Sequence, residues 1–166
     1  MIAVYSETGK GTTFKIHFPR CDQAPVVSPP AKANAIRGGT ETILLVDDAS
    51  ALRKLTRLLL EERGYTVIDS GDPGEALRMA ADHIGPLPLM ITDLVMPGFS
   101  GSVLAERLAA IRPETKVLYT SGYADDEVVQ LNVPGQDRAF LEKPFSRDAL
   151  VTKVRDLLDL APHPAP

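Results

Sequence analysis

This chain of 166 residues lacks features that define several classes of protein. It has one cysteine, Cys21, so no disulfide can form within it, and the proline-rich surroundings indicate an ordinary exposed thiol. No apolar run approaches the roughly 20 residues that cross a bilayer, and the first residues show no signal-peptide pattern. We therefore expect a cytoplasmic chain without direct membrane contact, while its parent protein remains open to membrane association.

An excess of positive charge is also missing. The formal net charge is −4, which argues against a nucleic-acid partner, because such partners favour basic surfaces. Hydrophobic residues make up 44% of the chain, which is enough for a substantial core. The length allows one ordinary domain plus additional segments.

Apolar segments recur at regular intervals through most of the chain. Predicted strands begin near Ile43, Thr66, Leu89, Lys116 and Ala139, separated by 23 to 27 residues. Each interval holds one strand, one helix and two short loops, which is typical of successive βα units. The first and third strands are almost wholly apolar, as strands buried on both faces are. We predict a doubly wound α/β domain with a five-stranded parallel sheet in the flavodoxin-like order 2-1-3-4-5.

Five helices follow these strands in the prediction. The first has an apolar face opposite a basic one; the apolar face is formed by Leu52, Leu55, Leu58 and Leu59, and the basic face by Arg53, Lys54 and Arg57. Pro73 suits the first turn of the second helix. Ser100 and Ser146 are candidate N-caps of the third and last helices. The fourth helix, over residues 125–131, is the weakest in pattern.

The two ends differ from this alternating region. Residues 1–20 alternate like two strands joined by a glycine-containing turn, which predicts a hairpin. Residues 21–40 are rich in proline, alanine, serine and glycine and predict a linker. The expected domain occupies residues 41–160, and the last six residues, 161–166, form a proline-rich tail expected to be disordered.

Charged residues end three of the predicted strands. Asp47 and Asp48 follow the first strand, Asp93 follows the third, and Lys143 follows the fifth. The carboxyl ends of parallel strands share one edge of the sheet, where ligands bind in such folds. Three carboxylates and one ammonium at this edge indicate a divalent cation beside an aspartate that can be phosphorylated.

Each of these residues also has a simpler interpretation. Asp48 is a favourable N-cap for the first helix, and Asp93 suits a loop that leads into the Pro97-Gly98 turn. Lys143 and Thr120 are compatible with ordinary strand residues. The functional interpretation gains weight because all four positions fall at one sheet edge.

Four segments carry a resemblance to a known family: Leu45-Val46-Asp47-Asp48, Asp93-Leu94-Val95-Met96-Pro97-Gly98, Thr120-Ser121-Gly122 and Lys143-Pro144-Phe145. In this order and at these strand ends they are highly specific. Residues 41–160 resemble the receiver domain of two-component signalling proteins. The resemblance implies a phosphorelay function, in which Asp93 takes a phosphoryl group from a phosphohistidine of a histidine kinase or a histidine phosphotransfer protein.

The resemblance also assigns roles within the site. Asp48, Asp93 and the backbone carbonyl of Val95 would bind Mg²⁺ directly, and Asp47 mostly through water. Lys143 would pair with Asp93 and then with the phosphoryl group. Thr120 and Phe140 would form the conformational switch. The family pattern also predicts a cis peptide bond between Lys143 and Pro144.

The first 20 residues resemble the end of the ATP-binding domain of histidine kinases, on the stretch Gly9-Lys10-Gly11-Thr12-Thr13-Phe14. The resemblance implies a hybrid histidine kinase as the parent, while the other nucleotide-binding segments are absent. We therefore expect no kinase activity from this chain alone. A hairpin separated from its sheet leaves strand edges unpaired, and we hypothesise that it pairs with a second copy to form a homodimer.

Two rival functions stay open at this point. One is a Mg²⁺-dependent phosphatase with an aspartyl nucleophile, although such enzymes usually place that nucleophile on the first strand and not the third. The other is a protein-interaction module that is never phosphorylated. Turnover of a small phosphate ester would favour the first, and failure to react with a phosphodonor would favour the second.

Overall fold

The computed structural model describes residues 2–18, 37–122 and 138–160. The chain divides into two units, Met1–Ala33 and Asn34–Pro166, which we treat separately. The predicted fourth helix over residues 125–131, the tail over 161–166, Cys21 and most of the expected linker lie outside the described residues. None of the helices in the described ranges is both long and apolar enough to span a bilayer.

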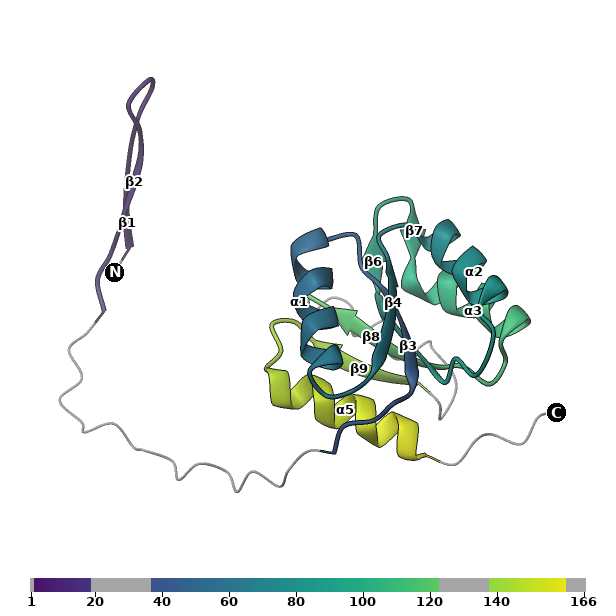
Figure 1. The fold of residues 1–166 in the computed structure, drawn as a ribbon. Helices are drawn as coiled ribbons and strands as arrows, with labels where there is room; N and C mark the ends of the chain where they lie inside the picture. The colour runs from purple at the N-terminus through teal and green to yellow at the C-terminus, as the bar shows by residue number, and fades with distance from the viewer. Residues whose placement is uncertain (1, 19–36, 123–137, 161–166) are drawn as a thin grey trace. The chain divides into compact units, whose positions relative to one another are not determined.

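The larger unit is built on a five-stranded parallel sheet (Figure 1). Its strands are β3 (Thr42–Val46), β4 (Thr66–Ser70), β5 (Leu89–Asp93), β8 (Lys116–Ser121) and β9 (Arg138–Glu142). They lie in the order β4-β3-β5-β8-β9. This is the predicted order 2-1-3-4-5, and each strand begins within one residue of its predicted start, so the fold class is confirmed.

In the part of the chain that the structure describes, four helices connect or follow these strands: α1 (Ser50–Glu61), α2 (Pro73–Asp82), α3 (Gly101–Ile111) and α5 (Arg147–Asp159). Short polar side chains fix three of their amino ends, as N-caps should. Asp72 accepts a hydrogen bond from the Glu75 amide, and Ser100 and Ser146 cap α3 and α5 in the same way. Pro73 stands in the first turn of α2, as the sequence predicts.

The sheet separates two aliphatic cores because its side chains alternate between its faces. Leu44, Met90 and Tyr119 face α2 and α3 on one side. Ile43, Ile91 and Leu118 face α1 and α5 on the other. Figure 1 shows the helices in these two layers. The sheet is thus buried on both faces, and its carboxyl edge is left to present the loops that carry the acidic residues.

The apolar face predicted for α1 was wrong in two of its four positions. Leu55 and Leu58 are 52% and 58% exposed, whereas Leu60 and Thr56 are buried. Residues 58–60 are three consecutive leucines, so spacing alone does not identify which of them faces inward. Contact with β3 and β4 turns the helix so that Leu60 enters the core.

The smaller unit contains an antiparallel hairpin, β1 (Ile2–Glu7) and β2 (Gly11–Ile16), as predicted. The register pairs Ile2 with Ile16 and Val4 with Phe14, which places these four side chains on one face. All four are more than half exposed. Within its own unit, the hairpin therefore presents an apolar face that no described element of that unit covers.

Candidate phosphoryl and metal site

Three aspartates meet at the carboxyl edge of the sheet. Asp47 and Asp48 follow β3, and Asp93 ends β5, the neighbouring strand. One carboxylate oxygen from each lies within 4.8 Å of the other two. Asp47 is buried, Asp93 is half-buried and Asp48 is exposed. Oxygen donors in such a group are the ligands that Mg²⁺ prefers, so the donor set fits the predicted cation.

Asp48 does not act as the N-cap of α1. Helix α1 begins at Ser50, its N-cap position is Ala49, and no described side chain caps it. The Ala49 amide instead donates to Asp47 Oδ1 at 2.8 Å. Within the described ranges, the Asp48 carboxylate has no hydrogen-bond or ion-pair partner. Its oxygens are therefore available to a ligand, unlike those of a capping aspartate.

Lys143 joins the acidic group from β9. Its Nζ atom donates to Asp93 Oδ2 at 2.9 Å and to Asp47 Oδ2 at 3.0 Å. Burial alone would lower the pKa of Lys143, but the hydrogen bonds to Asp93 and Asp47 outweigh it and hold the pKa above its usual value. The side chain therefore stays an ammonium at neutral pH. The Lys143–Pro144 peptide bond is cis, the geometry that the family resemblance predicts.

Thr120 lies directly beside the acidic group on β8. It pairs in register with Asp93, and its backbone oxygen accepts a hydrogen bond from the Leu94 amide. The buried Thr120 hydroxyl donates to the Thr92 backbone oxygen at a long 3.4 Å. This weak contact leaves the hydroxyl available for a stronger acceptor nearby.

Phe140 packs on the next strand, opposite Tyr119 in the register of β8 and β9. The two rings stack with their centroids 5.1 Å apart and their planes 21° from parallel. Phe140 is half-buried, whereas Tyr119 is fully buried. Because the Phe140 ring is only partly buried, it can rotate to a more buried or a more exposed position.

The loop after β5 follows the Asp93 carboxylate closely. The Val95 amide lies 3.4 Å from Asp93 Oδ1, which places the backbone of Val95 beside the acidic group. A short ladder, β6 (Val95–Met96) with β7 (Phe99–Ser100), closes this loop around Gly98, whose φ is +70°. A left-handed φ is favourable only for glycine and a few short polar residues, which explains Gly98 at this turn.

A family model for the response regulator receiver domain matches residues 43–155. The chain belongs to the receiver family. Receivers bind Mg²⁺ in an acidic pocket and interact with histidine kinases or phosphotransfer proteins. The cluster of Asp47, Asp48 and Asp93 stands where such a pocket is expected.

Two curated relatives and one solved structure show how far this receiver resembles known proteins. It is 37% identical over 163 residues to the sensor kinase CckA of Brucella abortus (strain 2308), covering 93% of this chain but only 17% of the kinase. It is 32% identical over 119 residues to the receiver protein CpdR of the same organism, covering 70% of this chain and 95% of CpdR. The solved receiver domain of the hybrid histidine kinase CckA matches with a TM-score of 0.61 at 31% identity, covering 71% of this chain and 99% of that domain.

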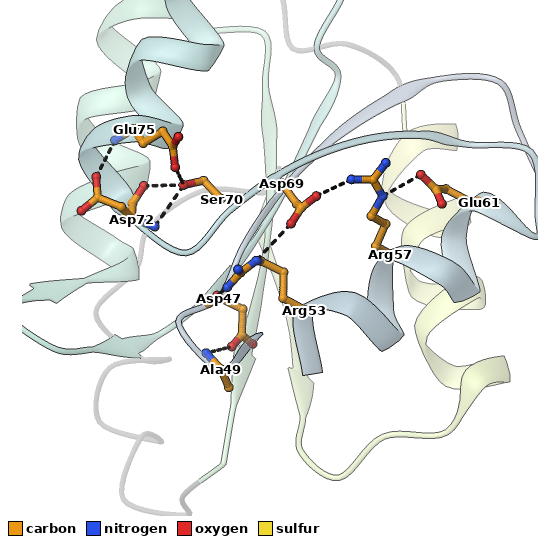
Figure 2. A network of polar contacts seen from close by, with 9 residues as sticks. All are labelled: Asp47, Ala49, Arg53, Arg57, Glu61, Asp69, Ser70, Asp72 and Glu75. Atoms are coloured by element: carbon orange, nitrogen blue, oxygen red, sulfur yellow. Dashed lines mark hydrogen bonds and ion pairs between the residues drawn. The ribbon is translucent and has the colours of Figure 1, made fainter. Parts of the chain in front are cut away.

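The structure also adds a polar network to the receiver site that the sequence did not single out. Arg53 and Arg57 of α1 both bind Asp69 of β4 (Figure 2). The sequence placed both arginines on a basic surface opposite the apolar face of the helix. That interpretation was wrong for Arg53, whose side chain is only 17% exposed. Asp69 follows the apolar residues of β4 near the end of that strand. An isolated acid at this place is the feature of the sequence that could have indicated a basic partner on α1.

Proposed function

We propose that Asp93 accepts a phosphoryl group from a phosphohistidine. A carboxylate oxygen of Asp93 attacks the phosphorus, and the bond from phosphorus to the imidazole nitrogen breaks. The electron pair stays on that nitrogen, which takes up a proton. The observation that supports this role is the position of Lys143, whose ammonium binds Asp93 directly at 2.9 Å. Phosphoryl transfer depends mainly on positioning and charge neutralisation, and this contact provides both.

Asp48, Asp93 and the Val95 carbonyl would hold Mg²⁺, with Asp47 acting mostly through water. The ion supplies neutralisation of the charge on the phosphoryl oxygens. Without a cation, the three carboxylates repel one another. Lys143 partly relieves this repulsion by binding both Asp47 and Asp93, and these contacts hold the nucleophile in place.

Thr120 and Phe140 form the proposed switch. The hydroxyl of Thr120 now makes only a long contact to Thr92, so a phosphoryl oxygen on the neighbouring Asp93 would be a stronger acceptor. Movement of Thr120 at β8 would then change the packing of Phe140, which pairs with the adjacent Tyr119. Phe140 has no hydroxyl, so its part in the switch rests on packing alone.

We further propose that the parent protein is a hybrid histidine kinase. The alignment with CckA covers 93% of this chain, more than the segment that the receiver model matches. The hairpin of β1 and β2 would then be the end of a kinase ATP-binding domain, followed by a linker and the receiver. The chain would not phosphorylate histidine by itself, and its partner would be a histidine kinase or a histidine phosphotransfer protein.

The proposal predicts that a small phosphodonor with Mg²⁺ adds one phosphoryl group to the wild-type chain and none to Asp93→Asn. Intact-mass measurement follows the reaction, and Asp82→Asn is the matched control because Asp82 is an exposed acid at the end of α2. Equal labelling of wild type and Asp93→Asn would refute Asp93 as the acceptor. No labelling of the wild type would favour an unphosphorylated interaction module, and continuous release of phosphate would favour a phosphatase.

A further inference from the structure

Arg53 connects the acidic site to a neighbouring strand. Its Nη1 atom donates to the backbone oxygen of Asp47 at 2.5 Å, and its Nε atom donates to Asp69 Oδ2 at 3.0 Å. Figure 2 shows the guanidinium between these two residues. Both Arg53 and Asp69 are largely buried, with 17% and 19% of their side chains exposed. A charge-assisted pair that is shielded from water holds its geometry better than an exposed one.

The second oxygen of Asp69 is also held. Arg57 Nη1 donates to Asp69 Oδ1 at 2.6 Å, so both carboxylate oxygens have a cationic donor. Asp69 therefore has little freedom to rotate and acts as a fixed anchor for Arg53. The N–H donors of a guanidinium keep a rigid geometry relative to one another. An Arg53 side chain that is fixed by Asp69 therefore also restrains the position of the Asp47 carbonyl oxygen.

The carbonyl that Arg53 holds belongs to the peptide between Asp47 and Asp48. That peptide is planar, so fixing its oxygen also restricts where the Cα atom of Asp48 lies. The Asp48 carboxylate itself has no protein partner among the described residues. Its position therefore depends on the backbone that carries it. Two side chains restrain this backbone: Arg53 binds the Asp47 carbonyl, and Asp47 Oδ1 accepts from the Ala49 amide.

Gly71 leaves the space that Arg53 occupies. A Cβ atom at Gly71 would lie 2.7 Å from Arg53 Nη1 and 3.2 Å from Cζ. The φ of Gly71 does not fall in the left-handed region, so alanine is compatible with the backbone there. An alanine would therefore displace the guanidinium without removing any charge.

We propose that Arg53 is a positioning residue for the metal site, acting on Asp48 through the Asp47 carbonyl. This inference rests on the proposed function, since it assigns the residue a purpose in Mg²⁺ binding. A purely electrostatic role predicts the opposite effect from a positioning role. Removing a cation near three carboxylates would tighten Mg²⁺ binding, whereas loss of positioning would weaken it.

The test is an NMR titration with Mg²⁺ that follows the Asp48 and Ala49 amides, and it requires no phosphorylation. For Arg53→Gln we expect the Mg²⁺ Kd to rise about tenfold, at the lower end of what losing a supporting group costs a metal site. Gly71→Ala should also raise the Mg²⁺ Kd, by a smaller factor than Arg53→Gln does. The matched control is Arg155→Gln, because Arg155 is equally exposed at 17% and bridges Glu41 and Asp159 without contacting Asp47. It should lose stability like Arg53→Gln and keep wild-type Mg²⁺ affinity.

A Kd for Arg53→Gln that equals or lies below the wild-type value would overturn the inference. If Arg53→Gln does not fold, Gly71→Ala takes its place, and a Kd for Gly71→Ala that equals or lies below the wild-type value would overturn the inference. Phosphodonor labelling at saturating Mg²⁺ separates this inference from the proposed function. A wild-type chain that binds Mg²⁺ but takes no phosphoryl group refutes the function alone. A labelled wild type with unchanged Mg²⁺ affinity in both variants refutes the inference alone.

Discussion

At the scale of single residues, the site depends on a balance of opposite charges. Lys143 holds Asp47 and Asp93 together through contacts of 3.0 and 2.9 Å. The same ammonium competes with any cation that the carboxylates bind. Lys143 therefore stabilises the acidic group, and it would weaken the affinity of that group for the proposed Mg²⁺.

Replacing Lys143 with methionine should separate these effects. We expect Lys143→Met to bind Mg²⁺ about three- to tenfold more tightly, because one competing positive charge is removed, and to take up phosphoryl groups more slowly. Calorimetric Mg²⁺ titration and intact-mass labelling measure the two quantities. Lys54→Met, which removes an exposed lysine of α1, is the control and should match the wild type. Weaker Mg²⁺ binding by Lys143→Met would contradict the competition.

The sequence predicted which charged residues lie together at the sheet edge, but not the side chains that hold them there. Asp47, Asp48, Asp93 and Lys143 follow strand ends, and a parallel sheet brings such ends together; this inference needs only the strand assignment. Arg53 belongs to a helix whose rotation about its axis was misjudged. Its contact with Asp69 depends on that rotation, so the sequence alone did not reveal it.

At the scale of elements, the orientation of α1 decides which leucines enter the core. The sheet strands were predictable because buried parallel strands are short and almost continuously apolar. Helix α1 was harder because its leucine run offers several faces with similar apolar content, and packing against β3 and β4 selects among them. The small β6–β7 ladder was expected only as a Pro97-Gly98 turn, since two-residue strands carry no periodicity.

Two leucines of α1 form a matched pair that tests this orientation. Leu60→Ala should lower the free energy of unfolding by about 2–5 kcal/mol, because it empties a fully buried position. Leu58→Ala should change it by about 0.5 kcal/mol or less, because Leu58 is mostly exposed. Urea denaturation measures both values. Equal losses in the two variants would show that the helix faces the core differently.

At the scale of the whole molecule, the chain combines a receiver domain with an N-terminal hairpin that belongs to a unit of its own. Ile2, Val4, Phe14 and Ile16 form the apolar face of the hairpin, and a two-stranded sheet is marginally stable in isolation. Both features favour pairing of the hairpin with another sheet. In the parent protein, this sheet would be that of the proposed kinase domain.

For the isolated chain, we expect pairing between the hairpins of two copies. Small-angle scattering should give the mass of a dimer for the full chain and of a monomer after deletion of residues 1–36. The Val4→Lys/Phe14→Lys double variant should also be monomeric, since it places two charges on the apolar face of the hairpin. A full chain that scatters as a monomer at the highest measured concentration would contradict this prediction.

The central claim is that the acidic residues after β3 and at the end of β5 build one cation site at the sheet edge. A crystal structure determined with Mg²⁺ tests this claim most directly. The account predicts one ion bound by Asp48, Asp93 and the Val95 carbonyl, at the distances of about 2.0–2.1 Å that are typical of Mg²⁺. A well-ordered site without the ion at saturating Mg²⁺, or an ion bound away from Asp93, would contradict it.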